Sequence, residues 1–375
     1  MTTLATGVET MTSRERWLAT LDCRPVDRLV FWPKLNGSYP PAQVEPFRSM
    51  SLPELHEWVG SDMLHHVGQG FRTVDEPGFR TWVEKGGERE RVSYFQTPTG
   101  TMDLPERWDD DSKSWHPVDH PVRTRDDIVR MAELFRQRRV EIDEDGLAEA
   151  RSYAEHLREE QTGAIAVGVG ESPLMYCVEW LCGIENIHYH LHDYPDEMAE
   201  LFDALHEHLA DRIRVLAEHN PADFIWLTEN TSTTLISVEQ YEQLNAPHIE
   251  EYARICDAAG NRLILHMCGH LKKLLPRLAT MPTTGFEAFT APTLGNTTLL
   301  DGRTACPDKC LIGGTHAMLW IESADRIIDQ IRRWLDELPH HRGIAVTSSG
   351  VMPPACSPET IRKVRDWVTE YPVRN

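Results

Sequence analysis

The chain has 375 residues, of which 59 are acidic and 38 basic, giving a formal net charge of −21. This charge argues against nucleic acid or an anionic membrane as partner, since both attract clusters of lysine and arginine. No apolar run approaches the roughly 20 residues that span a bilayer, and the first residues lack a signal-peptide pattern, so we expect a cytoplasmic protein. The eight cysteines have no framework spacing, which indicates reduced thiols or metal ligands.

Short apolar runs alternate with longer stretches of helical periodicity along the chain. Runs of this length fit parallel strands that are covered on both faces. The predicted strands are Arg28–Trp32, Asp62–Val67, Ala164–Val169, Asp223–Leu227, Arg262–Met267, Gly285–Phe289, Lys309–Gly313 and Gly343–Thr347. Eight strands alternating with helices predict a (β/α)8 TIM barrel. An open doubly wound sheet is the alternative, but no glycine-rich phosphate-binding turn follows a predicted strand.

Several helices have recognisable beginnings. Capping-box patterns stand at Ser51 to Glu54 and at Ser237 to Gln240, and Ser357-Pro358 places proline at a first helical position. The predicted helices include Pro195–Glu218, Val238–Ala259, Ala324–Leu338 and Pro358–Glu370. The remaining segments complete a single domain over residues 1–375, with the first fifteen expected to be disordered or loosely attached.

Residues 80–105 interrupt the alternation of predicted strands and helices. Their alternating segments surround Glu-Lys-Gly-Gly, which predicts a β-hairpin inserted after the second strand. The acidic, arginine-rich stretch 106–160 is predicted to be solvated helix and loop.

The fifth predicted strand ends in His266 and Cys268. Side chains two residues apart on a strand share a face, and active sites of barrels lie where their strands end. An imidazole and a thiolate so placed suit tetrahedral Zn²⁺, which accepts nitrogen and sulfur ligands. The alternative is that the cysteine packs as a small apolar residue and the histidine binds backbone.

Two ligands do not complete a metal site, and other strand ends offer a third. Glu229, Glu287 and Cys356 are the candidates, and the two glutamates are also candidate catalytic groups. Glu287 stands in the apolar run Gly285–Phe289, where packing alone does not explain a carboxylate. Further strand-end positions predict polar lining of a substrate pocket by Asn36, Tyr39, His65 and His316.

The chain resembles the uroporphyrinogen decarboxylase superfamily, and within it the corrinoid-dependent, methylcobalamin:coenzyme M-like methyltransferase branch. Five segments carry the resemblance in the family's order and spacing: Arg14–Arg28, Thr97–Met102, Glu287–Gly295, Ile312–Gly314 and Pro353–Glu359. The family fold is a (β/α)8 barrel. The branch binds zinc through a His-x-Cys at a strand end, which corresponds to His266 and Cys268.

The chain also departs from this branch. A further cysteine of the branch follows a glycine in the final loop, where this chain has Gly350 and Val351. Cys356 or Glu287 would then replace that ligand. The decarboxylase activity needs arginines after the first strand, and none lies in Phe31–Tyr39.

The resemblance implies a zinc-dependent methyltransferase. It would move a methyl group between a corrinoid, carried by a partner protein, and a small thiol or methylated substrate. The alternatives are a metal-independent decarboxylase or lyase of the same fold, and a binding protein on a barrel without catalysis. Members of the family often dimerise, so a homodimer is a further expectation.

Overall fold

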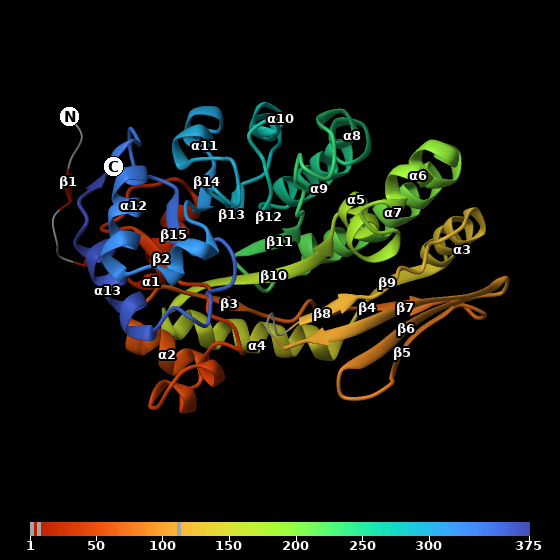
Figure 1. Cartoon of the computed structure of the whole chain (residues 1–375), viewed down its shortest axis with the longest axis horizontal. Helices are drawn as coiled ribbons and strands as arrows, with labels where there is room; N and C mark the ends of the chain where they lie inside the picture. Colours follow the sequence, from red (N-terminus) through yellow and green to blue (C-terminus); the bar gives the residue numbers. More distant parts are fainter. Residues whose placement is uncertain (1–3, 6–8, 111–113) are drawn as a thin grey trace.

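The computed structural model describes residues 4–5, 9–110 and 114–375. Its centre is an eight-stranded parallel sheet with the strand order β2-β15-β14-β13-β12-β11-β10-β3, a nearly closed barrel (Figure 1). The outer strands β2 and β3 meet through one backbone hydrogen bond, in which the Asp62 N–H donates to the Phe31 carbonyl at 2.8 Å. The TIM-barrel prediction is confirmed.

All eight predicted strands are present within a few residues of their predicted ends. They are β2 (Val30–Trp32), β3 (Met63–His66), β10 (Gly163–Glu171), β11 (Phe224–Thr228), β12 (Arg262–His266), β13 (Gly285–Phe289), β14 (Cys310–Gly313) and β15 (Ile344–Thr347). Their apolar runs are continuous because one set of side chains fills the barrel and the other packs under the helices.

Trp32, Phe224 and Ile264 belong to the buried cluster inside the barrel, whereas Phe31, Ile225 and Leu265 belong to the larger cluster outside it. Helix α1 (Ser13–Leu21) closes the amino-terminal end of the barrel, where the Trp17 ring packs edge-on against Trp32 at 6.1 Å between centroids. The interior is therefore a packed core, and chemistry is confined to the carboxyl ends of the strands.

Helices cover the outside of the barrel. They are α2 (Leu52–Val59), α4 (Glu144–Glu160), α7 (Pro195–His219), α8 (Val238–Leu244), α9 (Ala246–Ala258), α10 (Leu275–Thr280), α11 (Leu299–Ala305), α12 (Ala324–Asp336) and α13 (Pro358–Glu370). Both predicted capping boxes form, at Ser51 and Ser237. The helix predicted over Val238–Ala259 is wrong in one respect, since it divides at Asn245. Pro247 there lacks an N–H and restricts the residue before it.

Shorter elements complete the connections. They are the 3₁₀ turns Pro40–Ala42, Phe47–Ser49 and Ala317–Ile321, then α5 (Pro173–Tyr176), the π-helix Cys177–Leu181 and α6 (Asn186–Asp193). Strand β1 (Leu4–Ala5) pairs antiparallel with β16 (Val373–Arg374). Of the first fifteen residues, 1–3 and 6–8 lie outside the described part. Within it, the backbone N–H groups of Thr10 and Met11 donate to Asp27, so this stretch is attached to the barrel.

Residues 71–142 form an insert after β3. Strands β4 (Phe71–Asp75) and β9 (Arg138–Ile142) pair antiparallel at its base. Between them stand a four-stranded antiparallel sheet and α3 (Arg125–Arg136). The sheet consists of β5 (Arg80–Lys85), β6 (Glu90–Thr97), β7 (Gly100–Asp109) and β8 (Ser114–Pro117). The predicted hairpin is present as β5 and β6. The prediction of helix and loop over 106–160 is corrected, because β8, β9 and the end of β7 lie there.

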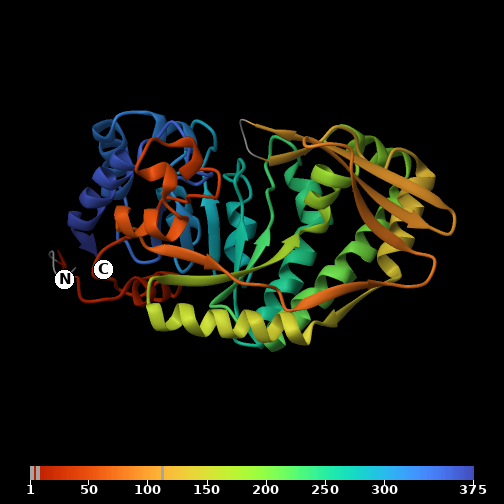
Figure 2. The ribbon, with the colours of Figure 1, turned by 90° about the horizontal axis from the view of Figure 1, so that it is seen from below.

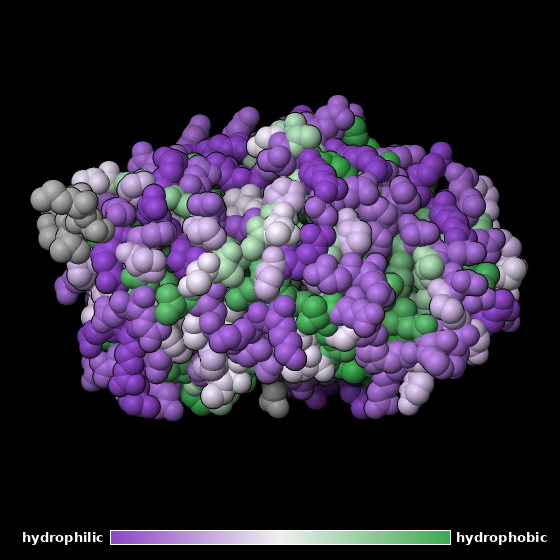
Figure 3. Space-filling view, turned by 90° about the horizontal axis from the view of Figure 1, so that it is seen from above, coloured by the Kyte–Doolittle hydropathy of each residue, from purple (hydrophilic) through white to green (hydrophobic). Residues whose placement is uncertain are grey.

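Barrel and insert lie side by side along the long axis of the molecule, and β10 and β11 point toward the insert (Figure 2). Hydrophilic side chains dominate the face in Figure 3, with apolar side chains in separate groups between them. No helix in the described part of the chain is long and apolar enough to cross a membrane.

Candidate active site

His266 and Glu287 form an ion pair inside the mouth of the barrel. They are neighbours in the register of β12 and β13, and His266 Nδ1 is hydrogen-bonded to Glu287 Oε2. The other oxygen of this fully buried carboxylate accepts from Lys34 Nζ at 2.7 Å. Burial favours a neutral acid, but Lys34 and His266 outweigh it and lower the pKa of Glu287. Glu287 is therefore an anion held between two cationic groups.

The same contacts set the protonation of His266. Burial would lower the pKa of its imidazole, but the charge of Glu287 and hydrogen bonds with Cys268 and Glu287 raise it to about 9. In the metal-free chain the imidazole is therefore protonated on both nitrogens near neutral pH, with Nδ1 toward the carboxylate. A metal bound at Nε2 would take the place of the proton there.

Aromatic rings form the floor beneath this pair. The Trp226 ring stacks on His266 with centroids 5.6 Å apart and lies 5.4 Å from the His66 ring. The Lys34 ammonium lies 5.6 Å from the centroid of Trp226 and 5.7 Å from that of Trp32. These contacts restrict the rotamers of His266 and Lys34, so the charged groups are preorganised.

Cys268 lies beyond the strand end and is exposed. Its thiol donates to Asn230 Oδ1, with 3.3 Å between the sulfur and the oxygen. The loop after β11 is tied to β12 because the Glu229 and Asn230 N–H groups both donate to the His266 carbonyl, at 2.9 and 3.0 Å. The thiol and the imidazole thus both belong to the end of β12, and the loop after β11 places Asn230 beside the thiol.

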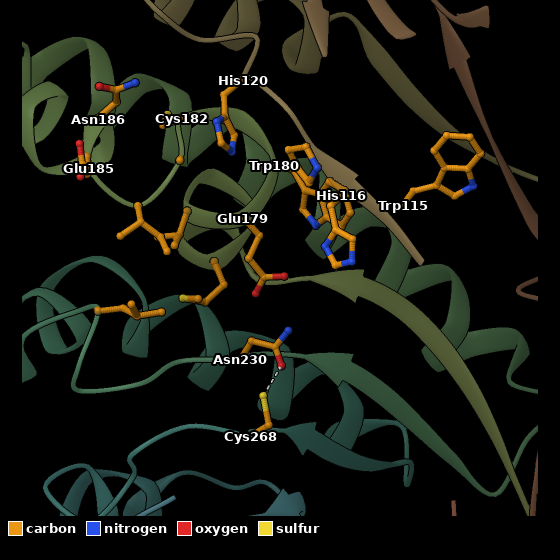
Figure 4. Close-up of a pocket in the computed structure, with 16 residues that line it drawn as sticks. Trp115, His116, His120, Glu179, Trp180, Cys182, Glu185, Asn186, Asn230 and Cys268 are labelled. Carbon is orange, nitrogen blue, oxygen red and sulfur yellow. Dashed lines mark hydrogen bonds between the residues drawn. The ribbon is translucent and has the colours of Figure 1, made fainter. Parts of the chain in front are cut away.

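A cavity of about 830 Å³ opens from Cys268 toward the insert. Its residues come from three places: β8 and the loop after it, the segment from α5 to α6, and the loops after β11 and β12. They are Trp115, His116, Pro117, His120, Met175, Val178, Glu179, Trp180, Cys182, Gly183, Ile184, Glu185, Asn186, Asn230, Leu235 and Cys268. In Figure 4, Glu179, Asn230 and Cys268 follow one another down the cavity wall. The cavity therefore joins the barrel mouth to the insert.

Two carboxylates line this cavity, and Glu179 lies nearer to Asn230 and Cys268 than Glu185 does (Figure 4). Glu179 stands on the π-helix, an irregularity that often marks functional sites. Burial raises the pKa of Glu179, and the Glu171 charge adds to this, while a hydrogen bond with Asn230 and the charge of His266 oppose it. A carboxyl group with a raised pKa holds its proton more readily than an ordinary one and is suited to exchange it with a ligand.

Of the predicted site residues, His266, Cys268 and Glu287 are brought together. Glu229 is not, although it directly precedes Asn230. It is fully buried and accepts hydrogen bonds from the Thr231 hydroxyl and from Asn245 Nδ2. Burial raises the pKa of Glu229 to about 7, against hydrogen bonds from Ser172, Thr231 and Asn245. This carboxyl group ties β11 to the beginning of α9 and does not line the cavity.

Cys356 and Tyr39 also lie away from the pair. Cys356 is buried in the apolar cluster outside the barrel, and burial raises the pKa of its thiol to about 12. Tyr39 is fully buried and its hydroxyl donates to the Cys356 carbonyl. Both residues fasten the loop before α13 to the loop after β2. Cys356 therefore lies apart from His266 and Cys268, and Tyr39 does not line the cavity.

The other three predicted lining residues are also displaced from the cavity. The Asn36 side chain accepts from the backbone and the hydroxyl of Ser38, at 3.2 and 2.7 Å, and shapes the turn after β2. His65 points out of the barrel to Thr162, in a cavity beside α1, because strand alternation turns His66 inward instead. His316 lines a separate cavity near Trp334.

Most residues that line the cavity were not predicted, among them Glu179, Trp180 and Asn230, and neither was Lys34. Glu179 carried a usable signal, since it is the one carboxylate in the apolar run Pro173–Leu181. Lys34 and Asn230 follow strands β2 and β11, the positions where barrel sites are built. Trp180 offered no signal of its own.

Comparison with known proteins agrees with this architecture. The sequence profile described as uroporphyrinogen decarboxylase (URO-D) matches residues 112–371, well over half of the chain. The chain belongs to the uroporphyrinogen decarboxylase family. A search of curated proteins gives no match. Among solved structures, a methyltransferase from Methanosarcina mazei aligns over 96% of this chain and 98% of its own, with 15% identity and a TM-score of 0.60.

A second solved structure is provisionally assigned as a vitamin B12-independent methionine synthase from Listeria monocytogenes. It aligns over 58% of this chain and 68% of its own, with 14% identity and a TM-score of 0.37. Because its sequence identity is low, the Methanosarcina structure supports only the fold of this chain. The TM-score of the Listeria structure is too low to add to that.

Proposed function

We propose that this family member is a methyltransferase that acts between a corrinoid carried by a partner protein and a small thiol or methylated substrate in the cavity. One observation carries the proposal: the Cys268 thiol, hydrogen-bonded to the His266 imidazole at the end of a barrel strand, lines a cavity large enough for a substrate. The likeness of the fold to a methyltransferase structure is consistent with it.

His266 and Cys268 together have features of a zinc site. Metal-binding histidines usually donate their second N–H to a carboxylate, as His266 does to Glu287. No group of three His, Cys, Asp or Glu side chains with metal-site geometry occurs among the described residues. Of the three candidates for a third ligand, only Glu287 touches His266. His266 and Cys268 would therefore hold the ion, with Glu287 orienting the imidazole, and further positions would be left to substrate. Bound zinc would lower the pKa of a substrate thiol or polarise a methyl-bearing heteroatom.

The chain's own residues have definable tasks in this reaction. Glu287 is hydrogen-bonded to Nδ1 of the imidazole and so leaves Nε2 as the nitrogen that a metal would bind in place of a proton. Lys34 balances the buried charge of Glu287, so the carboxylate stays ionised without a metal. Asn230 holds the Cys268 thiol in position, and Glu179 lies beside them to give or take a proton.

The decarboxylase alternative lacks support at the site. A polycarboxylate substrate needs arginine or lysine partners. None of the described residues that line the cavity is a lysine or an arginine.

Metal analysis together with a methyl-transfer assay tests the proposal. We expect near-stoichiometric zinc in the purified protein, and loss of this zinc in Cys268→Ala. Cys356→Ala is the matched control, because its thiol lies in the apolar cluster, and it should retain zinc. Methyl transfer is followed by the absorbance change of methylcobalamin with a thiol as acceptor. Absence of zinc from carefully prepared wild type, together with absence of transfer, contradicts the proposal.

A further inference from the structure

A second, smaller cavity lies between the insert and the barrel. Its volume is about 160 Å³, well below the roughly 300 Å³ at which pockets for drug-sized ligands begin, so it suits a molecule of a few atoms. The insert contributes residues of α3 and β9 to its wall, and the barrel contributes the end of β10, α5 and α7. It shares no lining residue with the cavity at Cys268, since Met175 lines that cavity and Tyr176 lines this one.

The wall of this small cavity contains buried nitrogens without hydrogen-bond partners in the described part of the chain. Both ring nitrogens of His208 are unpaired, although the residue is only 5% exposed. The buried Nε of Arg212, which follows on the same helix α7, is unpaired as well. Buried polar atoms of folded proteins nearly always bind a partner. These nitrogens therefore indicate that the cavity takes a polar ligand or water.

The two arginines of the small cavity differ in their partners. Arg138 is ion-paired, because its Nε donates to Asp75 Oδ1 at 2.8 Å. Within the described residues Arg212 forms no ion pair, and its hydrogen bond is a long one, from Nη2 to the Thr73 hydroxyl at 3.5 Å. The positive charge that lacks a partner therefore belongs to Arg212.

Glu171, the carboxyl group of this cavity wall, does not fully balance that charge. Burial raises the pKa of Glu171, against its own backbone N–H and the charge of Arg212. Burial also lowers the pKa of Arg212, against Tyr176 and Glu171, and the charge of Arg138 adds to the lowering. Each shift favours the uncharged form, so neither group compensates the burial of the other.

The groups beside Arg212 are hydrogen-bond donors. Burial raises the pKa of the Tyr176 hydroxyl to about 12, so it keeps its proton. Burial and the charges of Arg212 and Arg138 lower the pKa of His208 to about 3, so its imidazole is neutral and has one N–H. A guanidinium with further N–H and O–H donors around a small space is a suitable partner set for a carboxylate.

We infer that the small cavity binds a carboxylate of a few atoms with a single negative charge, held by Arg212, His208 and Tyr176 between the barrel and the insert. One negative charge matches the one unpaired guanidinium. The site is independent of zinc and of methyl transfer, because none of its lining residues lines the cavity at Cys268.

Carboxylates nearby limit the charge of this ligand. Glu171 lines the small cavity itself. Asp203, Glu207 and Asp211 line a hollow of about 300 Å³ that adjoins it and shares His208 with it. A multiply charged anion would lose its hydration and meet these carboxylates. Phosphate is therefore expected to bind more weakly than acetate.

Thermal melting of the full, chelator-treated chain tests the inference with four probes at an ionic strength held constant by sodium chloride. Acetate is the expected ligand, acetamide has its shape without the charge, methylammonium reverses the charge, and phosphate adds to it. We expect acetate to raise the melting temperature saturably, by about 2 °C at about ten times its dissociation constant. Acetamide and methylammonium should leave it unchanged, and phosphate should raise it less than acetate.

Three variants locate the binding. Arg212→Met should abolish the acetate shift, and Arg212→Lys, which keeps the charge but loses the planar fork, should weaken acetate binding several-fold. His208→Phe keeps a ring against Phe135 but has no N–H, and should also weaken it several-fold. Arg214→Met is the matched control, because Arg214 lies on the same helix but is exposed and paired with Asp211 at 2.7 Å. It should retain the full shift.

Several results overturn the inference. Equal acetate shifts in wild type and Arg212→Met would mean a general salt effect. A shift with acetamide, methylammonium or phosphate as large as that with acetate would contradict the charge assignment. If Arg212→Met does not fold, an acetate affinity unchanged in both Arg212→Lys and His208→Phe overturns the inference instead.

Discussion

The buried pair of Lys34 and Glu287 gives the sharpest stability prediction. The two charges are 2.7 Å apart, with side-chain exposures of 15% and 0%. At an effective dielectric constant of about 20, Coulomb's law gives an attraction of about 6 kcal/mol for this distance. Loss of hydration on burial offsets part of it, and His266 remains beside Glu287 in the variant. We therefore expect Lys34→Met to lower the free energy of unfolding by about 3 kcal/mol.

A double-mutant cycle with Glu287→Gln measures the pair by urea denaturation in the presence of a chelator. Each single variant should lose about 3 kcal/mol, and the double variant about 4 kcal/mol, because removing both partners leaves no unpaired buried charge. The exposed pair of Lys363 and Asp325 is the control, and Lys363→Met should cost less than about 1 kcal/mol. Losses that add within about 0.5 kcal/mol would refute the coupling, and with it the argument that Lys34 keeps Glu287 ionised.

Two further substitutions probe the site and the amino-terminal end of the barrel. Gly269→Ala would place a Cβ 2.4 Å from the Thr231 carbonyl oxygen, so the loop that carries Cys268 must shift. We expect a loss of about 1–3 kcal/mol in stability and a loss of zinc, both measured on purified protein. Gly37→Ala, with no atom near its new Cβ, should change neither. At Asp27, burial alone would raise the carboxyl pKa, but Arg16 and the Met11 and Thr10 N–H groups lower it to about 2 from an ordinary 3.8. The stabilisation is complete above pH 4 and is lost as the pH falls through about 2. Asp27→Asn should therefore cost about 2 kcal/mol at pH 7, and urea titrations should show this gap closing between pH 4 and pH 2. A gap independent of pH would contradict the assignment.

Most barrel strands were predictable because they are buried on both faces. In β12, for example, Leu263 and Leu265 pack under the helices while Ile264 fills the interior, and the result is an uninterrupted apolar run. Of the insert, only the β-hairpin over residues 80–105 was predicted, from the glycine turn within it. Strands β7 and β8 pair over residues such as Glu106 and Arg107, whose charged side chains resemble those of a loop.

Within the site, whether a predicted residue reaches the barrel mouth depends on which face of its strand it occupies. His266 and Cys268 follow the inward positions of β12, and the same alternation applied to β3 selects His66 over His65. Glu229 and Asn230 differ in the same way, since one is buried under α9 and the other lines the cavity. Glu179 could not be placed by periodicity, because the π-helix departs from both the helical and the strand repeat.

The division of the cavity walls has a consequence for substitutions in the insert. The reacting groups stand on strand ends of the barrel, but Trp115 and His116 stand on β8, within a segment that leaves the barrel and returns to it at the paired strands β4 and β9. A change within this segment would therefore alter the part of the cavity wall formed by Trp115 and His116 without moving the strand ends that carry His266 and Glu287.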